Sequence, residues 1–319
     1  MGEQGNVRAK KVLLTGASGF VGRRIAQSFN SGQLTSLVRT SGFCGGGKEV
    51  VCKSFDDHEK LAEAVLGQNV VVHAAARAHV VDDGVLDPLA EYRKTNVDGT
   101  LNLARQAADA GVQRFVFLSS IGVNGNVNAS PFSETDLPRP EGPYAQSKLE
   151  AEQGLWEIQR RTGMEIVILR PPLVYGPDAP GNFGSLVRWV QKGVPLPLGS
   201  IHNKRSLVAL DNLVDLIITC IEHPAAANQV FLAGDGQDVS TTDLLRGVGR
   251  AMGKPARLIP VPASMLMLGA GLLGKKAVAQ RLLGSLQVDI SKARNLLGWE
   301  PPLSVEEGLR RCFVSENAS

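Results

Sequence analysis

A glycine-rich turn, set between an apolar run and a helical pattern, constrains this chain more than any other feature of its sequence. In the segment LLTGASGFVGRRI, residues 13–25, Gly16, Gly19 and Gly22 follow one another at intervals of three. Glycines in such a turn let the chain reverse tightly, let the backbone approach a pyrophosphate, and let the helix pack closely on the strand. The phosphates would also meet the amide groups at the start of the helix. The turn therefore predicts a dinucleotide site, with a plain structural turn as the alternative.

Apolar runs and helical patterns alternate through the first half of the chain. Strands are expected at 10–16, 34–39, 50–55, 69–76, 114–120 and 165–171, and helices at 20–30, 57–67, 89–111 and 142–163. Strands that are apolar throughout and alternate with helices form parallel sheets that are covered on both faces. The sequence therefore predicts an α/β fold: a doubly wound parallel sheet of the Rossmann type, with a smaller C-terminal α/β lobe for the substrate.

The composition of the chain changes after Pro171, where prolines and glycines become frequent. A helix at 207–223 and a strand at 228–234 are expected to rejoin the main sheet, and the later residues are expected to be mostly helical. This division predicts a disordered tail at 1–9, a dinucleotide-binding domain at 10–172 to which 205–235 return, and a substrate-binding lobe at 173–204 and 236–319.

Composition disfavours several other classes of protein. Of 319 residues, 43% are hydrophobic and 20% are charged, as is usual for globular enzymes. A formal net charge of +3 is too small to indicate nucleic-acid binding, and it suits an anionic small substrate. The cysteines lack C-x-x-C spacing and no histidine or acidic cluster has metal-ligand spacing, so we expect neither a disulfide framework nor a metal. No apolar run reaches the roughly 20 residues of a membrane span, and no signal-peptide pattern is visible, so a cytoplasmic protein is expected.

Tyr144 and Lys148 form a second informative pair. The segment GPYAQSK, residues 142–148, places them four residues apart at the start of an expected helix. At that spacing two side chains share one helical face, about 5–6 Å apart at Cβ. A charged lysine there would lower the pKa of a phenol that otherwise titrates at about 10, which makes the phenol usable as a general acid or base. The alternative is an interface tyrosine beside a solvated lysine.

The end of the second expected strand bears on the choice of dinucleotide. An acidic residue there would bind the adenine-ribose 2′-hydroxyl of NAD, but the segment LTSLVRTSG has no acid and places Arg39 in that region. An arginine can instead pair with the 2′-phosphate of NADP. NADP(H) is therefore preferred, with NAD(H) as the alternative and with Arg23 or Arg24 as candidate helpers. The competing interpretation of Arg39 is a solvated side chain on a loop.

Taken together, these motifs resemble those of the extended short-chain dehydrogenase/reductases, and within them the UDP-glucose 4-epimerase group and its 4-ketoreductase relatives. The resemblance covers almost the whole chain. Its motifs, in family order, are TGASGFVG (15–22), VVVHAAA (70–76), TNVDGTLNLA (95–104), FVFLSSIGVNG (115–125), PYAQSK (143–148), LRPPLVYGP (169–177), NKRSLVALDNLVDL (203–216) and DISKARNLLGWEP (289–301). One family feature is missing, because Lys53 and Ser54 stand where a glycine–aspartate pair usually contacts adenine.

The resemblance implies a catalytic set of Ser120, Tyr144 and Lys148. Tyr144 would exchange a proton with a sugar hydroxyl or ketone, while Lys148 would hold the ribose hydroxyls and favour the phenolate. Ser120, rather than Ser119, would bond the reacting oxygen, with a strand-end capping serine as the alternative. The same motifs imply the cofactor contacts Gly16, Ser18, Gly19, Phe20, Val21, Gly22, Arg39, Ala74, Ala75, Ala76, Asn96, Tyr144, Lys148 and Pro171.

Two further residues within these motifs have competing interpretations. Asn96 would support the catalytic set through a hydrogen bond, and the alternative is an asparagine on a helix surface. His73 lies on an apolar strand, so we expect it to be structural rather than catalytic.

The family also implies a UDP-sugar substrate and four residues that contact it. Ser120 would touch the sugar, and Asn182 matches a position that contacts the nucleotide diphosphate. Arg205 matches a phosphate-binding arginine, whose bidentate guanidinium suits a diphosphate, and Arg281 could play a similar part from the C-terminal lobe. The helices expected at 88–111 and 144–162 match those that pair subunits in the family, so a homodimer is expected.

Two reactions would use this catalytic set and would differ in the fate of the cofactor. A 4-epimerase oxidises C4 and returns the hydride, so it retains NAD. A 4-ketoreductase reduces a 4-keto sugar once and exchanges NADPH at each turnover. Arg39 without an acid favours reduction of a UDP-4-keto-6-deoxy-N-acetylhexosamine in O-antigen-type polysaccharide precursor synthesis. So do the short residues after Ser120 and Asn124, where the epimerase pattern commonly has a tyrosine. The alternative is an NAD-dependent UDP-hexose or UDP-N-acetylhexosamine 4-epimerase.

Two other activities are disfavoured by the sequence. The family's dehydratases carry acidic residues after the catalytic serine, but here Ser120 is followed by Ile121, Gly122 and Val123, so dehydration is not expected. A non-catalytic regulator on this fold is also disfavoured, because both Tyr144 and Lys148 are present.

The segment PASMLMLGAGLLGKK, residues 262–276, is apolar for about a dozen residues and then basic. It is too short to span a membrane. We expect a buried helix under the substrate lobe, and the alternative is a peripheral membrane contact through 263–276.

Overall fold

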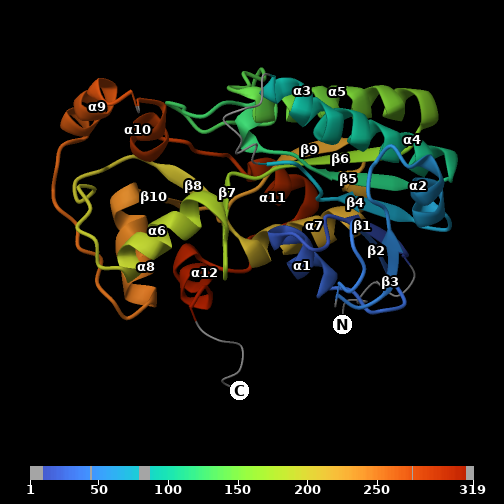
Figure 1. The fold of residues 1–319 in the computed structure, drawn as a ribbon, viewed down its shortest axis with the longest axis horizontal. Helices are drawn as coiled ribbons and strands as arrows, with labels where there is room; N and C mark the ends of the chain where they lie inside the picture. The colour runs from blue at the N-terminus through green and yellow to red at the C-terminus, as the bar shows by residue number, and fades with distance from the viewer. Residues whose placement is uncertain (1–9, 44, 79–86, 275, 314–319) are drawn as a thin grey trace.

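The computed structural model describes residues 10–43, 45–78, 87–274 and 276–313, and the expected tail at 1–9 lies outside them. Within these residues seven strands form one sheet in the order β3-β2-β1-β4-β5-β6-β9, and all neighbours are parallel. The doubly wound parallel sheet is thereby confirmed (Figure 1). Its strands are β1 (Val12–Thr15), β2 (Leu34–Val38), β3 (Lys48–Val51), β4 (Val70–His73), β5 (Arg114–Leu118), β6 (Glu165–Arg170) and β9 (Gln229–Leu232).

Helices cover both faces of this sheet. On one face the core includes α1 (Phe20–Ala26), α7 (Leu210–Glu222) and α11 (Ser291–Leu297), and on the other α2 (His58–Val65), α4 (Thr100–Asp109) and α5 (Pro143–Thr162). Strand β1 shows how the layers form, because Val12 and Leu14 enter the first core and Leu13 enters the second. Successive side chains of a strand point to opposite faces, so a strand covered on both sides is apolar throughout.

The expected helix at 89–111 is divided. It consists of α3 (Pro88–Arg93), a π-helical turn (Lys94–Gly99) and α4. Such turns insert an extra residue into a helix and occur often at functional sites. This one carries Asn96, which is buried. The interruption therefore directs an amide side chain inward.

Beyond Pro172 the chain builds the smaller α/β lobe. Its sheet has the order β10-β8-β7, with β7 (Leu173–Tyr175), β8 (Arg205–Ala209) and β10 (Asp238–Val239). It has a core of its own, to which α6 (Gly181–Gln191), α8 (Thr241–Ala251) and α12 (Val305–Arg311) contribute. Because β8 belongs to this sheet, only α7 and β9 of the expected return at 205–235 rejoin the main one. The domain boundaries as a whole stay a prediction. Short 3-10 turns lie at Ile121–Val123 and Pro224–Ala226.

The expectation of a buried helix in the segment 262–276 was wrong. Helix α9 (Ala263–Leu272) has no buried residue, and Leu268 and Leu272 are 70% and 84% exposed. It packs beside α10 (Lys276–Leu283), and Figure 1 shows both at one end of the molecule, in orange and red. Among the described residues, no helix combines the length and the apolar character needed to cross a bilayer.

Candidate active site

The glycine turn follows β1 and lies against the end of β4. Gly16 has a φ of +72°, and a Cβ there would lie only 2.6 Å from the amide nitrogen of Ala75. A Cβ on Gly22 would lie 2.0 Å from the carbonyl oxygen of Gly16, so α1 can pack on the turn only through a glycine. The residues of this turn therefore fit a bound dinucleotide, because a pyrophosphate needs a tight turn whose backbone it can approach without meeting side chains.

The other predicted cofactor contacts near the turn divide by exposure. Ser18 and Gly19 are exposed, whereas Phe20 and Val21 are partly buried and pack against the core. Beyond β4 the chain rises toward the surface through the partly buried Ala74 and Ala75 to the exposed Ala76. Pro171, directly after β6, is buried, and its carbonyl accepts a hydrogen bond from the Ile121 amide at 3.0 Å. These segments follow neighbouring strands and meet at the carboxyl edge of the sheet, where ligands of such folds bind.

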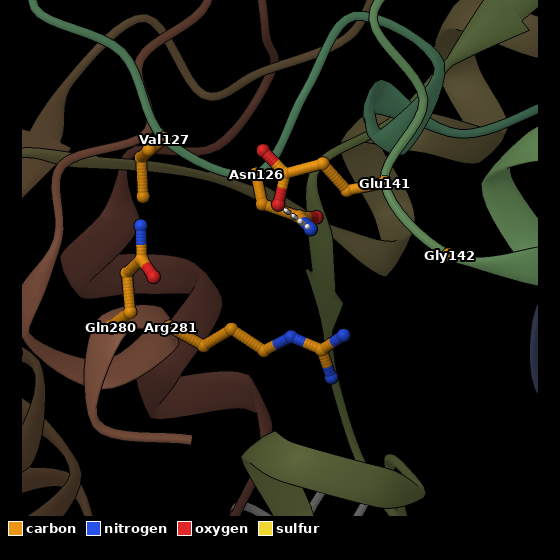
Figure 2. A pocket seen from close by; sticks show the side chains of 6 residues that line it. All are labelled: Asn126, Val127, Glu141, Gly142, Gln280 and Arg281. Carbon is orange, nitrogen blue, oxygen red and sulfur yellow. Dashed lines mark hydrogen bonds between the residues drawn. The ribbon is translucent and has the colours of Figure 1, made fainter. Parts of the chain in front are cut away.

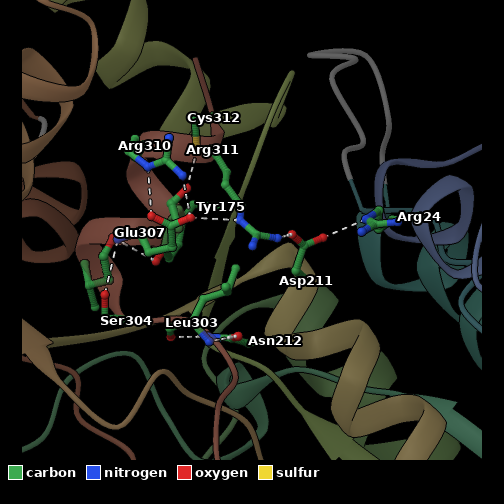
Figure 3. Close-up of polar contacts among 12 residues, drawn as sticks. Arg24, Tyr175, Asp211, Asn212, Leu303, Ser304, Glu307, Arg310, Arg311 and Cys312 are labelled. Atoms are coloured by element: carbon green, nitrogen blue, oxygen red, sulfur yellow. Dashed lines mark hydrogen bonds and ion pairs between the residues drawn. The ribbon is translucent and has the colours of Figure 1, made fainter. Parts of the chain in front are cut away.

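Arg39 is the first residue after β2, on the same edge, and it is exposed. Of its two candidate helpers, Arg23 bonds the carbonyl of Ser18 at 2.9 Å and so stays beside the turn. Arg24 does not fit the role. Its Nε lies 2.6 Å from a carboxylate oxygen of Asp211, whose other oxygen lies 3.0 Å from Arg311 (Figure 3).

Tyr144 and Lys148 both lie on the first turns of α5. Lys148 is 1% exposed, and its Nζ donates to the carbonyl of Leu118 at 2.8 Å and lies 4.4 Å from the centre of the Phe117 ring. The alternative of a solvated lysine is therefore wrong. The ring of Tyr144 packs edge-on against that of Tyr92, with 5.8 Å between centroids.

The pKa values of this pair differ from the sequence-based expectation. Burial, with a smaller effect of Tyr92, raises the pKa of the Tyr144 phenol to about 12. Burial lowers the pKa of the Lys148 ammonium to about 7, although the Glu152 carboxylate opposes that shift. The charged form of each group is penalised where few solvent dipoles surround it. Without a bound cofactor, the surroundings of Tyr144 therefore favour the protonated phenol over the phenolate.

Ser119 and Ser120 are adjacent but have different surroundings. Ser119 is buried, and its hydroxyl donates to Glu152 at 2.5 Å behind the site. Ser120 is partly exposed, and its Oγ accepts the Gly122 amide at 3.1 Å, capping the short turn that follows. A Cβ on Gly122 would lie 3.4 Å both from this Oγ and from Ala145 Cβ. Ser120 therefore begins a short turn that packs against the first turn of α5, and its capping bond leaves its own proton available for another acceptor.

Asn96 links the loop after β4 to α5. Its Oδ1 accepts the Arg77 amide at 2.8 Å, and its Nδ2 donates to the Ser147 hydroxyl at 3.0 Å. Ser147 in turn donates to the carbonyl of Tyr144 at 2.8 Å. The alternative of a surface asparagine is excluded, since Asn96 is 1% exposed. Its direct contact with a cofactor stays a prediction.

The sequence patterns did not predict a buried ion pair that lies behind the predicted catalytic residues. Glu152 accepts two hydrogen bonds from Arg170, at 3.0 and 2.5 Å, and both side chains are at most 6% exposed. Arg170 also donates to Asn124 at 3.0 Å. Together with Ser119, these contacts tie α5 to the ends of β5 and β6. One signal was available, because Glu152 continues the four-residue spacing of Tyr144 and Lys148 along one helical face.

His73 is structural, as expected. It is fully buried, with its ring nitrogens 2.6 Å from the Thr15 hydroxyl and 2.9 Å from the Thr100 hydroxyl. Burial, helped by the charge of Lys148, lowers the pKa of its imidazole to about 3. It is therefore neutral at physiological pH and joins β1, β4 and α4.

A pocket of about 230 Å³ opens between the loops that precede α5 and helix α10. Figure 2 shows Arg281 reaching across it below Asn126 and Glu141, which share a hydrogen bond. Gly142, two residues before Tyr144, lies on its wall; the full lining is Asn126, Val127, Glu141, Gly142, Gln280 and Arg281. The pocket therefore adjoins the start of α5, which carries Tyr144 and Lys148.

The structure brings together two of the predicted substrate residues. The guanidinium of Arg205 on β8 donates to the carbonyl of Arg281 at 2.8 Å, so the two arginines meet at the end of α10. Asn182 lies on a different element, exposed at the start of α6. Whether these three side chains contact a substrate stays a prediction.

Residues 12–234 match the NAD dependent epimerase/dehydratase family. The chain belongs to this family. It is 46% identical over 308 residues to a UDP-glucose 4-epimerase of Vibrio cholerae, covering 95% of this chain and 94% of that protein. It is 28% identical to an N-acetyl-α-D-glucosaminyl-diphospho-ditrans,octacis-undecaprenol 4-epimerase of Escherichia coli O157:H7, covering 96% and 95% of the two chains.

Solved structures show the same fold. The chain matches a UDP-glucose 4-epimerase from Thermotoga maritima, solved with UDP-glucose, with a TM-score of 0.76 at 24% identity over 95% of this chain and 97% of that one. The family match and the 46% identity to an epimerase over almost the whole chain make the protein an enzyme of the extended short-chain dehydrogenase/reductase type. The family depends on a nicotinamide dinucleotide, which the glycine turn fits and which supplies or accepts a hydride.

Three residues near the cofactor turn could act on an oxygen that gains or loses this hydride, or hold the cofactor. Tyr144 can hold a proton at its phenolic oxygen and give it to an oxygen nearby. Ser120 can donate its hydroxyl proton to the same oxygen and so stabilise developing charge. Lys148, fixed by the Leu118 carbonyl, can donate further hydrogen bonds at the sheet edge. Among the described residues no group of three or more histidines, cysteines and acids is placed to hold a metal ion.

Proposed function

We propose that this enzyme transfers hydride at C4 of a UDP-sugar. The finer proposal is the NADPH-dependent reduction of a UDP-4-keto-6-deoxy-N-acetylhexosamine, as in polysaccharide precursor synthesis. The C4 position is supported by the names of the two relatives, both of which are 4-epimerases. The choice of reduction rests on two features of the site: the partly buried Tyr144 phenol packed edge-on against Tyr92, and the exposed Arg39 directly after β2.

A pKa of about 12 keeps the Tyr144 phenol protonated at neutral pH. Reduction of a ketone needs a proton donor for the alkoxide that forms at C4, and a protonated phenol is ready for that step. Oxidation of a sugar hydroxyl begins instead with removal of a proton, which requires a phenolate. The exposed Arg39 directly after β2 adds support, because it suits the 2′-phosphate of NADPH.

In this proposal each residue has one role. As hydride reaches C4, Tyr144 donates its proton to the C4 oxygen, and the C=O double bond becomes CH–OH. Ser120 donates a hydrogen bond to the same oxygen throughout. Asn182, Arg205 and Arg281 bind the diphosphate of the UDP-sugar from the smaller lobe, where guanidinium groups suit phosphate oxygens.

The second candidate is NAD-dependent 4-epimerisation of a UDP-hexose or UDP-N-acetylhexosamine. It is favoured by the relative at 46% identity, a UDP-glucose 4-epimerase. The same residues would act, with Tyr144 first taking a proton and then returning it. The positive charge of an oxidised nicotinamide beside the phenol would then have to lower its pKa by several units.

The cofactor separates the two candidates. The protein is purified without added nucleotide and denatured, and any released dinucleotide is identified by chromatography. Reduction predicts an empty site that binds NADPH at least tenfold more tightly than NADH, and Arg39→Ser should remove most of that preference while Arg105→Ser, on the exposed surface of α4, should not. Stoichiometric NAD retained through purification would instead identify the epimerase.

We also propose a homodimer built through α3, α4 and α5, and a cytoplasmic location. The dimer can be measured by sedimentation at micromolar protein. A monomer at every concentration would contradict it.

A further inference from the structure

Helix α9 carries the strongest unexplained surface of the molecule. Of the large hydrophobic side chains that are exposed in the described residues, five fall within fifteen consecutive positions: Ile259, Met265, Leu268, Leu272 and Leu273. Isolated exposed leucines are common on enzymes, whereas contiguous exposed apolar surface marks a contact with something else. None of these side chains takes part in the site described above.

The helix is seated on the protein and its outward surface is bare. Ala263 and Leu266 pack against the core of the smaller lobe, and α10 packs beside α9. The chain that enters α9 is also tied down, since the Gly199 amide donates to the Ile259 carbonyl at 2.9 Å. The exposed leucines are therefore presented by a supported helix rather than by a loose end.

Charge around α9 identifies what could cover it. Between Asp243 and Asp289 the sequence contains no aspartate or glutamate and seven lysines and arginines. Six of these are exposed in the structure: Arg246, Arg250, Lys254, Arg257, Lys276 and Arg281. An apolar helix within a wholly cationic segment is complementary to a bilayer with anionic headgroups, which attracts the basic residues while the apolar side chains enter the interface.

A second copy of this chain fits the surface less well. A two-fold symmetric contact through α9 would place the same basic residues opposite one another, with no carboxylate from this segment to offset them. A membrane has no such conflict. The length of α9, from Ala263 to Leu272, suits a helix that lies in the interface and does not cross it.

We propose that α9 docks the enzyme on an anionic membrane surface. Leu268, Leu272 and Leu273 enter the boundary between headgroups and acyl chains, and the exposed Lys254, Arg257 and Lys276 contact lipid phosphates. Because Gln280 and Arg281 of the neighbouring α10 line the pocket, docking also holds the mouth of that pocket close to the bilayer. The surface is separate from the catalytic residues, so docking and turnover can be measured independently.

Flotation with vesicles tests this proposal on the full chain. Vesicles of phosphatidylglycerol and phosphatidylcholine are mixed with wild-type protein and with the double variant Leu268→Ser/Leu272→Ser. Wild type should float with the vesicles, and losing two buried leucines should lower its partition coefficient about tenfold or more. The matched control is Leu66→Ser/Leu137→Ser, which removes two leucines that are 75% and 78% exposed elsewhere and should change nothing.

Lipid composition and salt give a second readout. Vesicles of phosphatidylcholine alone should bind less protein, and 0.5 M salt should weaken binding to the anionic vesicles, because screening acts on exposed charges. Wild type that stays unbound would overturn the proposal. Equal loss in the control variant would also overturn it, as would a change of oligomeric state in the α9 variant without any change in flotation, which would assign the surface to a second copy.

Discussion

Strand β1 and helix α9 are both short apolar segments, yet they have opposite environments. Val12, Leu13 and Leu14 are all 0% exposed, whereas Leu272 is 84% exposed. The strand belongs to an alternation of strands and helices that supplies a covering layer on each face. Helix α9 follows loops and has only one side against the protein. An apolar run therefore predicts burial only where the surrounding pattern also supplies the layers that cover it.

The main sheet with its catalytic edge should also be separable in function from α9. The substitution with the largest expected effect tests this. Replacing Tyr144 by phenylalanine removes the proton donor while keeping the ring against Tyr92. Turnover should fall by about 10²–10⁴-fold, since that is what a positioned general acid contributes. Dinucleotide binding, measured by fluorescence titration, and vesicle flotation should both stay as in wild type. Turnover within threefold of wild type would refute the catalytic assignment.

The next largest effect concerns the ion pair behind the site. Glu152→Gln leaves Arg170 charged and buried without its carboxylate, which should lower the free energy of unfolding by about 3–5 kcal/mol. Urea unfolding measures this. The control is Glu63→Gln, which breaks an exposed pair with Lys60 and should change the free energy of unfolding far less, because solvent screens exposed charges. Equal losses of unfolding free energy in the two variants would mean that burial of the Glu152–Arg170 pair does not increase its contribution to stability.

A smaller effect distinguishes two glycines with the same backbone. Gly16 and Gly67 both have φ of +72°, but an added Cβ would meet Ala75 at Gly16 and nothing within 4 Å at Gly67. Alanine at either position should cost about 1–2 kcal/mol through the left-handed backbone. Gly16→Ala should cost about 1–3 kcal/mol more through overlap, and it alone should weaken dinucleotide binding in calorimetry. Unchanged dinucleotide affinity in Gly16→Ala would contradict the role of this turn in cofactor binding.

Much of the fold followed from the sequence because its signals are local. The glycine turn, the apolar strands and the proline that follows Arg170 each specify a conformation within a few residues. Boundaries were less certain. The third strand was expected at 50–55 but runs from Lys48 to Val51, because Ser54 to Asp57 form the turn that starts α2. The π-helical turn around Asn96 was not visible, since nothing local marks an inserted residue.

The site was predictable in part for the same reason. Tyr144, Lys148 and Ser120 lie in short motifs, and the structure places them on neighbouring elements at the sheet edge. The ion pair of Glu152 and Arg170 was not predicted, because it depends on a contact between α5 and β6 and joins residues 18 positions apart in sequence. The pKa of Tyr144 was expected to fall and instead rises to about 12, because burial outweighs any local charge.

One measurement tests the central claim most directly. The enzyme is incubated with UDP-4-keto-6-deoxy-N-acetylhexosamine and NADPH that carries deuterium at its transferable position, and the product is examined by mass spectrometry and NMR. The proposed function predicts one deuterium per product molecule, bound to C4, and formation of that product about 10²–10⁴-fold more slowly with Tyr144→Phe. Product without deuterium, or interconversion of UDP-hexoses with no consumption of NADPH, would contradict it.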